Sequence, residues 1–268
     1  MLAENASIQR IADALHLAET ETSPIEPIRP ILAAGDIEAA YAVQDINTER
    51  ALVSGRRLVG RKIGLTAKSV QRQLGVDQPD FGMLFADMEV ENGGELPHAR
   101  LIAPKVEAEV AFVIGRNLAI PQPTVADVIR AVEFVLPALE IVDSRIANWD
   151  IRIVDTVADN ASSGRFVLGS VPRLLAGLDL RLAGMVLEHN GEPASTGAGA
   201  ACLGHPLVAL QWLARKMFDV GRPLQEGDIV LSGALGPMVP ATPDSVFEAR
   251  VSGLGTVAVT FTSSDRRA

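Results

Sequence analysis

The residues best suited to chemistry in this sequence are three glutamates on two short apolar segments. Glu107 and Glu109 lie within residues 106–114, and Glu140 lies within residues 135–142. Both segments are rich in β-branched residues, which predicts that they are strands. Because side chains at positions i and i+2 share one face of a strand, we expect Glu107 and Glu109 to point the same way.

Glu140 is the least ordinary of the three glutamates. Apolar residues flank it on both sides, without the alternation that would give it a solvent-facing side. A buried carboxylate is unfavourable unless it is protonated, paired or bound to a cation. Three carboxylates from two strands would form an oxygen-rich pocket suited to a hard divalent ion such as Mg²⁺ or Mn²⁺. The alternative, a solvated face of a half-buried sheet, covers Glu107 and Glu109 but not Glu140.

Two further charged residues lie in segments that precede the glutamates. Lys62 belongs to a strand predicted at residues 57–64, and Asp80 belongs to a turn-rich loop at residues 76–82. A lysine in such a strand is usually an edge residue whose ammonium reaches solvent. The functional alternative is an ammonium that faces the acidic site and an anionic substrate. Asp80 has a structural alternative too, because aspartate beside turn residues commonly braces a loop.

The connection between the two glutamate strands decides how they meet. Thr124 begins a predicted helix, with Asp127 three residues later as in a capping box, and the helix is expected to end near residue 134. A strand–helix–strand unit of this length permits a parallel strand pair. We therefore expect a parallel arrangement that brings Glu140 alongside the face of Glu107 and Glu109.

The rest of the chain predicts an α+β protein in two parts. Helices are expected at residues 6–21 and from Asp36 to about residue 55, separated by a proline-rich segment, so residues 1–55 form a helical N-terminal arm. Residues 56–268 form the catalytic domain. Its second half is β-rich and includes a hairpin at Asn190–Gly191.

Composition bounds the class of protein. The chain has 268 residues, a formal net charge of -9 and one cysteine. The negative charge argues against nucleic-acid or anionic-membrane partners, and an anionic substrate would need a local positive group. A single cysteine excludes an intrachain disulfide and fits a reducing compartment. The absence of an apolar run of roughly 18 residues argues against a membrane span, and with no signal-peptide pattern at the N-terminus we expect a cytoplasmic protein.

Polar residues elsewhere offer weaker candidates. Ser162 and Asn160 lie in a segment that either forms a capped helical connection or lines a pocket, and composition does not decide between these. The loop after Gly233 would either present backbone N–H groups to an anion or form a tight turn. His189 and His205 are expected to be structural. The chain has no P-loop and no Gly-x-Gly-x-x-Gly motif, which argues against a nucleotide cofactor.

Seven ordered motifs, spread from the first predicted strand almost to the C-terminus, give the sequence a family resemblance. It resembles the fumarylacetoacetate hydrolase superfamily and, within it, the hydratases that act on 2-keto-4-pentenoate. The motifs lie at residues 60–66, 74–82, 106–109, 136–140, 158–162, 203–206 and 232–238.

The resemblance implies a fold, a cofactor and an activity. The fold is a mixed, rolled β-sheet with an N-terminal helical region. The cofactor is Mg²⁺ or Mn²⁺, held by Glu107, Glu109 and Glu140. The activity is the addition of water to 2-hydroxypenta-2,4-dienoate, giving 4-hydroxy-2-oxopentanoate, in the meta-cleavage degradation of aromatic compounds. The resemblance further implies a homo-oligomer, a pentamer or decamer, and possible association with a decarboxylase.

The resemblance also suggests roles for residues around the metal. Lys62 is the first candidate for an ammonium beside the substrate oxyanion or for a proton carrier, and Asp80 is the second. Ser162 would hold the substrate carboxylate or the water. Gly233 and Leu235 would supply backbone donors. Two alternatives remain open at this point: a 4-oxalocrotonate decarboxylase of the same superfamily, and a non-catalytic partner subunit.

Overall fold

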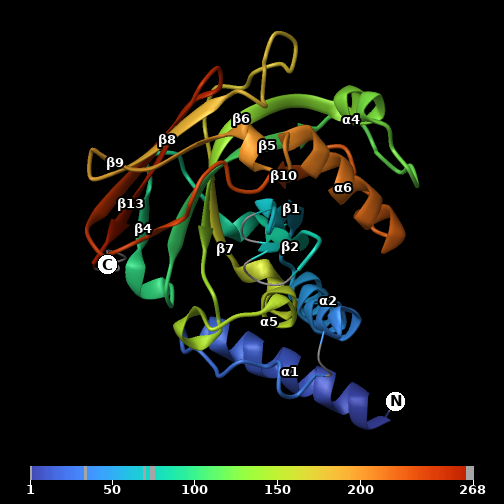
Figure 1. The fold of residues 1–268 in the computed structure, drawn as a ribbon. Coiled ribbons are helices and arrows are strands. Elements are labelled where there is room, and N and C mark those ends of the chain that lie inside the picture. The colour runs from blue at the N-terminus through green and yellow to red at the C-terminus, as the bar shows by residue number, and fades with distance from the viewer. Residues whose placement is uncertain (1, 33–34, 69–70, 73–75, 264–268) are drawn as a thin grey trace.

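Two β-sheets with helices at their periphery make up the structure, a computed structural model that describes residues 2–32, 35–68, 71–72 and 76–263 (Figure 1). The larger sheet has the strand order β2-β1-β10-β5-β6-β7-β3, with β11 also paired to β5. The smaller sheet has the order β4-β13-β12-β8-β9. Parallel and antiparallel pairs occur in both sheets. The predicted α+β class is confirmed.

The strands of the larger sheet are β1 (Leu58–Gly64), β2 (Asp80–Phe85), β3 (Glu89–Val90), β5 (Lys105–Ile114), β6 (Val132–Val142), β7 (Ser163–Leu168), β10 (Ile229–Leu231) and β11 (Val239–Pro240). Those of the smaller sheet are β4 (Glu95–Pro97), β8 (Gly184–His189), β9 (Glu192–Ala198), β12 (Ser245–Val251) and β13 (Gly255–Thr262). The α-helices with assigned bounds are α1 (Leu2–Thr20), α2 (Ile37–Val53), α4 (Val125–Ala131), α5 (Ile153–Ala158) and α6 (Pro206–Asp219).

Local sequence signals account for several of these elements. The Asp36 side chain accepts a hydrogen bond from the Ala39 N–H and begins α2, as predicted. Asn190 and Gly191 both have positive φ and join β8 to β9, as their sequence predicts. The sequence also predicts a short helix that begins at Thr66 as its cap and ends at Gly75, and part of this segment lies outside the described residues.

The prediction of a parallel pair for the two glutamate strands is wrong. β5 and β6 are antiparallel. The connecting helix α4 has seven residues and rises only about 10 Å, whereas the ten residues of β5 extend about 33 Å. The helix alone therefore does not return the chain to the start of β5, and the loop at residues 115–124 does not do so either. Instead the Gly115 N–H donates to the Ala131 carbonyl at 2.7 Å, so the chain re-enters the sheet at the end where it left.

This antiparallel register places the glutamates together more directly than a parallel pair would. Glu107 lies opposite Glu140, and Glu109 lies opposite Ala138. Residues directly opposite each other in an antiparallel pair project from the same face, about 5 Å apart. The intervening β5 residues project from the other face, where Ala108 and Val110 join the main hydrophobic core.

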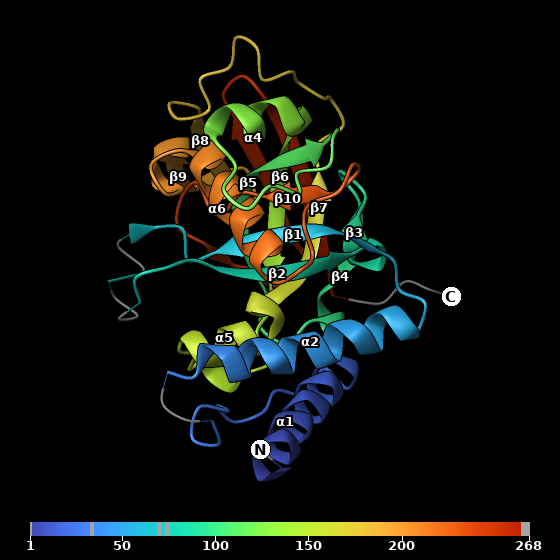
Figure 2. The ribbon, with the colours of Figure 1, turned by 90° about the vertical axis from the view of Figure 1, so that its right-hand side faces the viewer.

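The N-terminal helices pack on the segment that follows β6. Figure 2 shows α2 alongside α5 and α1 below them, and the three helices share one hydrophobic cluster with Ile146. Its members from the first 55 residues are Ile11, Ala12, Leu15, Ile28, Leu32, Ala39, Ala40 and Val43. The arm thus buries its apolar side against α5, while the domain boundary at residue 55 stays a prediction.

A single buried carboxylate fastens the arm to α5. Asp155, fully buried, accepts hydrogen bonds from the backbone N–H groups of Ile28, Arg29 and Arg152 at 2.8–3.0 Å. The Arg29 guanidinium adds an ion pair at 2.9 Å. The three backbone N–H donors would lose their acceptor if the carboxylate were removed.

Asp155→Ala is therefore expected to lower the free energy of unfolding by about 3 kcal/mol, since it leaves buried backbone N–H groups without an acceptor and leaves Arg29 with Asp150 as its remaining partner. Urea unfolding followed by circular dichroism measures this. Asp150→Ala is the matched control, because Asp150 pairs with the same arginine but its side chain is 62% exposed. The control should lose less than about 1 kcal/mol, and equal losses in the two variants would contradict the anchoring role.

Candidate metal centre and active site

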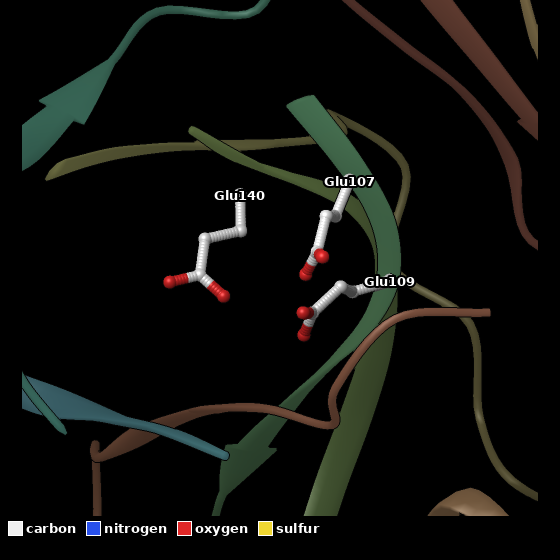
Figure 3. Close-up of side chains that lie close together, drawn as sticks. All are labelled: Glu107, Glu109 and Glu140. Carbon is white, nitrogen blue, oxygen red and sulfur yellow. The ribbon is translucent and has the colours of Figure 1, made fainter. Parts of the chain in front are cut away.

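The three glutamates converge in space. Figure 3 shows the side chains of Glu107 and Glu109 pointing from β5 toward that of Glu140 on β6. One carboxylate oxygen from each lies within 4.8 Å of the others. Glu109 and Glu140 are fully buried, and Glu107 lies deep as well but keeps some solvent access because it borders a cavity.

Without a cation, the close approach of these buried carboxylates is electrostatically unfavourable. Burial, followed by repulsion from Glu140, raises the pKa of Glu107 to about 7. Burial also raises the pKa values of Glu109 and Glu140. Among the described residues, Glu109 Oε1 and both Glu140 oxygens have no hydrogen-bond partner. Buried oxygens without donors on three convergent carboxylates suit a hard divalent ion, so the residues present fit Mg²⁺ or Mn²⁺.

Lys62 supplies a fixed positive charge beside the glutamates. It lies on β1, almost fully buried, with its Nζ 3.0 Å from Glu140 Oε1. The contact is an ion pair without hydrogen-bond alignment. Burial alone would lower the pKa of Lys62, but Glu140 and Asp80 together with the other glutamates raise it above its ordinary value. Lys62 is therefore an ammonium at neutral pH.

Asp80 lies on the strand next to Lys62. A Cβ built on Gly64 would come 2.2 Å from Asp80 Oδ1 and 3.4 Å from Lys62 Nζ, so both groups flank this glycine. Gly64 itself lines the cavity. Asp80 Oδ1 has no hydrogen-bond partner, and burial raises the pKa of this carboxyl despite the nearby ammonium. The absence of a side chain at Gly64 leaves the space in which Asp80 and Lys62 approach each other.

The hydroxyl groups of Thr156 and Ser162 lie close to each other and to Asp80. Thr156 Oγ1 donates to Asp80 Oδ2 at 3.4 Å and lies 3.5 Å from Ser162 Oγ. The structure thus places Ser162 one hydroxyl away from Asp80. Asn160, Ala161 and Ser162 all have positive φ, which is strained for residues other than glycine.

Asn160 holds this strained turn against β2 through paired hydrogen bonds to the backbone of Met83. Of the alternatives for Asn160, the structure shows the structural one. His205 caps α6, with Nδ1 accepting from the Leu207 N–H, and His189 stacks on Phe247. Both histidines are structural, as expected.

The two backbone donors suggested by the sequence are already used in this structure. The Gly233 N–H donates to Glu109 Oε2 at 2.7 Å, so it orients a glutamate of the site. The Leu235 N–H donates to the Ala108 carbonyl at 2.9 Å and belongs to the packing of β5. Neither N–H points freely into the cavity, because the loop crosses directly over β5.

A cavity of about 370 Å³ opens onto Glu107. Its wall comes from the end of β1, from the chain that follows and from the loop after Gly233, and apart from Glu107 the described lining residues are uncharged. They are Ile63, Gly64, Leu65, Thr66, Ala67, Ala201, Ala234, Gly236, Pro237 and Met238. The site therefore combines an anionic floor with a mainly apolar wall.

The sequence did not single out Gly64 or Thr156. Gly64 belongs to a family motif, but its role depends on how close Asp80 comes across the β1–β2 pair, which no local pattern reveals. Thr156 lies in a small helix whose contact with Asp80 is set by tertiary packing.

Comparison with known proteins places this site in a family. The fumarylacetoacetate hydrolase C-terminal family model matches residues 59–262, so the chain belongs to the fumarylacetoacetate hydrolase family. The chain is 58% identical to the TodF product hydratase of Pseudomonas putida F1, with 97% of each chain covered. It is 55% identical to the 2-keto-4-pentenoate hydratase of Paraburkholderia xenovorans LB400, over 96% of this chain and 95% of that one.

A solved structure is similar over almost the full length. It is the 4-oxalocrotonate decarboxylase from Pseudomonas putida G7 in complex with magnesium and adipate. The TM-score is 0.92 at 35% sequence identity, and 96% of this chain and 98% of that chain are covered. The resemblance seen in the sequence is confirmed.

The raised pKa values predict pH-dependent metal binding. A divalent ion must displace protons from the glutamates, and Glu107, with a pKa of about 7, holds its proton below that pH. MgCl₂ should therefore raise the melting temperature more at about pH 8 than at about pH 6.

In the absence of metal, the ionisation of Glu107 changes the stability of the fold with pH in the opposite direction. A carboxyl whose pKa is raised on folding favours the folded state at low pH, and Glu107 loses that contribution as pH rises from 4.5 to about 7.

Glu140→Gln should abolish stabilisation by MgCl₂, whereas Glu192→Gln, an exposed control with the same change of charge, should keep it. Equal stabilisation of both variants would exclude the three glutamates as the metal site.

Proposed function

We propose that this protein is a hydro-lyase that adds water to 2-hydroxypenta-2,4-dienoate and releases 4-hydroxy-2-oxopentanoate, with Mg²⁺ or Mn²⁺ held by Glu107, Glu109 and Glu140. The observation that carries the proposal is the convergence of buried carboxylate oxygens without donors beside the Lys62–Glu140 ion pair. The high identity to hydratases over nearly the whole chain supports the same activity.

The reaction requires protons to move at defined atoms of the substrate. Loss of the 2-hydroxyl proton and protonation at C5 convert the dienol to the 2-keto form, in which conjugation makes C4 electrophilic. The hydroxyl of water then adds at C4 and a proton adds at C3. Held by Glu107, Glu109 and Glu140, a divalent ion would act as a Lewis acid and lower the energy of negative charge on the substrate 2-oxygen. Side chains of this protein would carry out the proton transfers and add to the stabilisation of charge.

Lys62 and Asp80 have complementary roles in this proposal. The ammonium of Lys62 stays protonated and stabilises the negative charge that develops on the substrate 2-oxygen. Asp80 has a free oxygen beside the cavity-lining Gly64 and a raised pKa, as expected for a group that gives and takes a proton. Asp80 would donate to C5 and then accept a proton from the attacking water. Ser162 would act through Thr156 to keep Asp80 oriented.

The cavity favours hydration over the decarboxylase alternative. 4-Oxalocrotonate carries a second carboxylate at its far end, and a buried anion needs a partner. Apart from Glu107, the described residues that line the cavity are apolar or uncharged, and none of them is a cation. A monocarboxylate with a short hydrocarbon end fits such a wall better.

The remaining parts of the proposal concern the setting of the enzyme. We place it in the cytoplasm, as a homo-oligomer (a pentamer or decamer) in the meta-cleavage degradation of aromatic compounds, with possible association with a decarboxylase. None of the described helices is long and apolar enough to cross a bilayer.

Purified protein incubated with Mg²⁺ and 2-hydroxypenta-2,4-dienoate tests the activity. We expect the dienol absorbance to disappear, 4-hydroxy-2-oxopentanoate to accumulate by NMR, and both changes to stop after chelation of the metal. Release of CO₂ from 4-oxalocrotonate, without hydration of the dienoate, would instead identify a decarboxylase. If neither reaction is observed, the protein is a non-catalytic subunit.

Lys62→Met tests the ammonium. Because an oriented charge at a developing oxyanion is lost, kcat should fall about a hundredfold or more. Mg²⁺ binding, measured by calorimetry, should persist. Lys216→Met removes a lysine from the last turn of α6 and should keep full turnover. Full turnover in metal-loaded Lys62→Met would remove Lys62 from the mechanism.

A further inference from the structure

Lys105 has no role in the site described above. Lys105 begins β5, two residues before Glu107, so the side chains of Lys105, Glu107 and Glu109 project from one face of the strand. Burial increases along this row: Lys105 and Glu107 are half-buried and Glu109 is fully buried. The row therefore runs from the rim of the site into its depth, with a cation at the rim.

An aromatic ring holds this cation in place. Lys105 Nζ lies 4.1 Å from the centroid of the Trp149 ring, within the range of a cation–π interaction. The Trp149 indole N–H donates to the Ala103 carbonyl at 2.8 Å, which fixes the ring beside the start of β5. The arrangement restricts a side chain that would otherwise move freely at the protein surface.

The backbone that carries Trp149 is strained. Asn148 and Trp149 have φ values of 59° and 53°. Two consecutive left-handed residues other than glycine are unfavourable and persist where the surroundings or the function require them. The requirement here is local: this backbone conformation presents the indole to Lys105.

The ammonium of Lys105 is oriented but not neutralised by contact. Within the described part of the chain no carboxylate lies within ion-pair distance of Lys105, although Lys105 and Glu107 interact electrostatically. The strand β11, which pairs Pro240 with Lys105, directly follows the cavity-lining Met238. Lys105 is thus a positive charge two residues along β5 from the cavity-lining Glu107, in a chain with a net charge of -9, where an anion needs such a group.

We propose that Lys105 binds the carboxylate group of the substrate at the rim of the glutamate cluster, and that Trp149 is the positioning residue for Lys105. The nature of the substrate, a 2-oxo or 2-hydroxy dienoic acid, rests on the proposed function. Lys62 and Lys105 then have separate roles. The buried Lys62 faces the substrate 2-oxygen, and Lys105 at the rim binds the neighbouring carboxylate.

Calorimetric titration of the Mg²⁺-loaded protein with 2-oxopentanoate, a saturated analogue that cannot be hydrated, tests this binding directly. Lys105→Met should raise the Kd about tenfold, as expected for loss of one charge-assisted hydrogen bond. KM for the dienoate should rise by a similar factor while kcat stays within about twofold. Lys105→Arg should restore most of the affinity, and Lys216→Met, the matched loss of one positive charge, should leave the Kd unchanged.

Trp149 provides the second variant. Trp149→Leu should raise the Kd in the same direction as Lys105→Met, and Trp149→Phe, which keeps an aromatic face, should raise it less. Combining Lys105→Met with Trp149→Leu should add little beyond Lys105→Met alone, because Trp149 acts through Lys105. A purely structural Trp149 would give additive losses and would overturn the positioning role.

Mg²⁺ affinity separates this proposal from damage to the metal site. Removing a positive charge near Glu107 should leave Mg²⁺ affinity unchanged or tighter. Weaker Mg²⁺ binding in Lys105→Met, or an unchanged Kd for 2-oxopentanoate in the folded variant, overturns the proposal. If the wild type binds 2-oxopentanoate but does not hydrate the dienoate, the proposed function fails while the role of Lys105 is still decided by the titration.

Discussion

The structure depends on keeping like charges close together away from water. Three glutamates and an aspartate share a small buried volume with one fully buried ammonium, that of Lys62. One positive charge cannot balance four ionised carboxyls, so in the absence of a further cation the pKa values of the carboxyls rise. This imbalance prepares the site for a divalent ion, whose two positive charges would offset most of the excess negative charge.

The elements around the site keep this unfavourable arrangement from relaxing. β5 and β6 share ten paired residues, which fixes Glu107 against Glu140. The helical arm contributes from outside: Gln44 on α2 donates to the carbonyls of Phe81 and Val157, the neighbours of Asp80 and Thr156. The N-terminal arm, which lies outside the predicted catalytic domain, therefore supports both the strand that bears Asp80 and the helix that bears Thr156.

Much of the site could be predicted from the sequence because its signals are local. An acidic residue inside an apolar strand is visible without a structure, and it identified Glu140 as well as the Glu107–Glu109 pair. Long motifs identified the family and the α+β fold. The direction of β6 was not predicted, because it depends on where α4 ends: the helix was expected to continue to about residue 134, but it ends at Ala131 and β6 begins at Val132. Gly64, Thr156 and Lys105 gave no signal, since their roles arise from contacts between segments distant in the chain.

The antiparallel register of β5 and β6 has a consequence for assembly of the protein. Sliding one strand past the other by a single residue would turn Glu140 to the opposite face of the sheet, away from Glu107. An ion that needs all three carboxylates would bind only the correctly aligned strands. Metal uptake would then act as a check on folding, trapping the molecules in which the sheet has formed as it should.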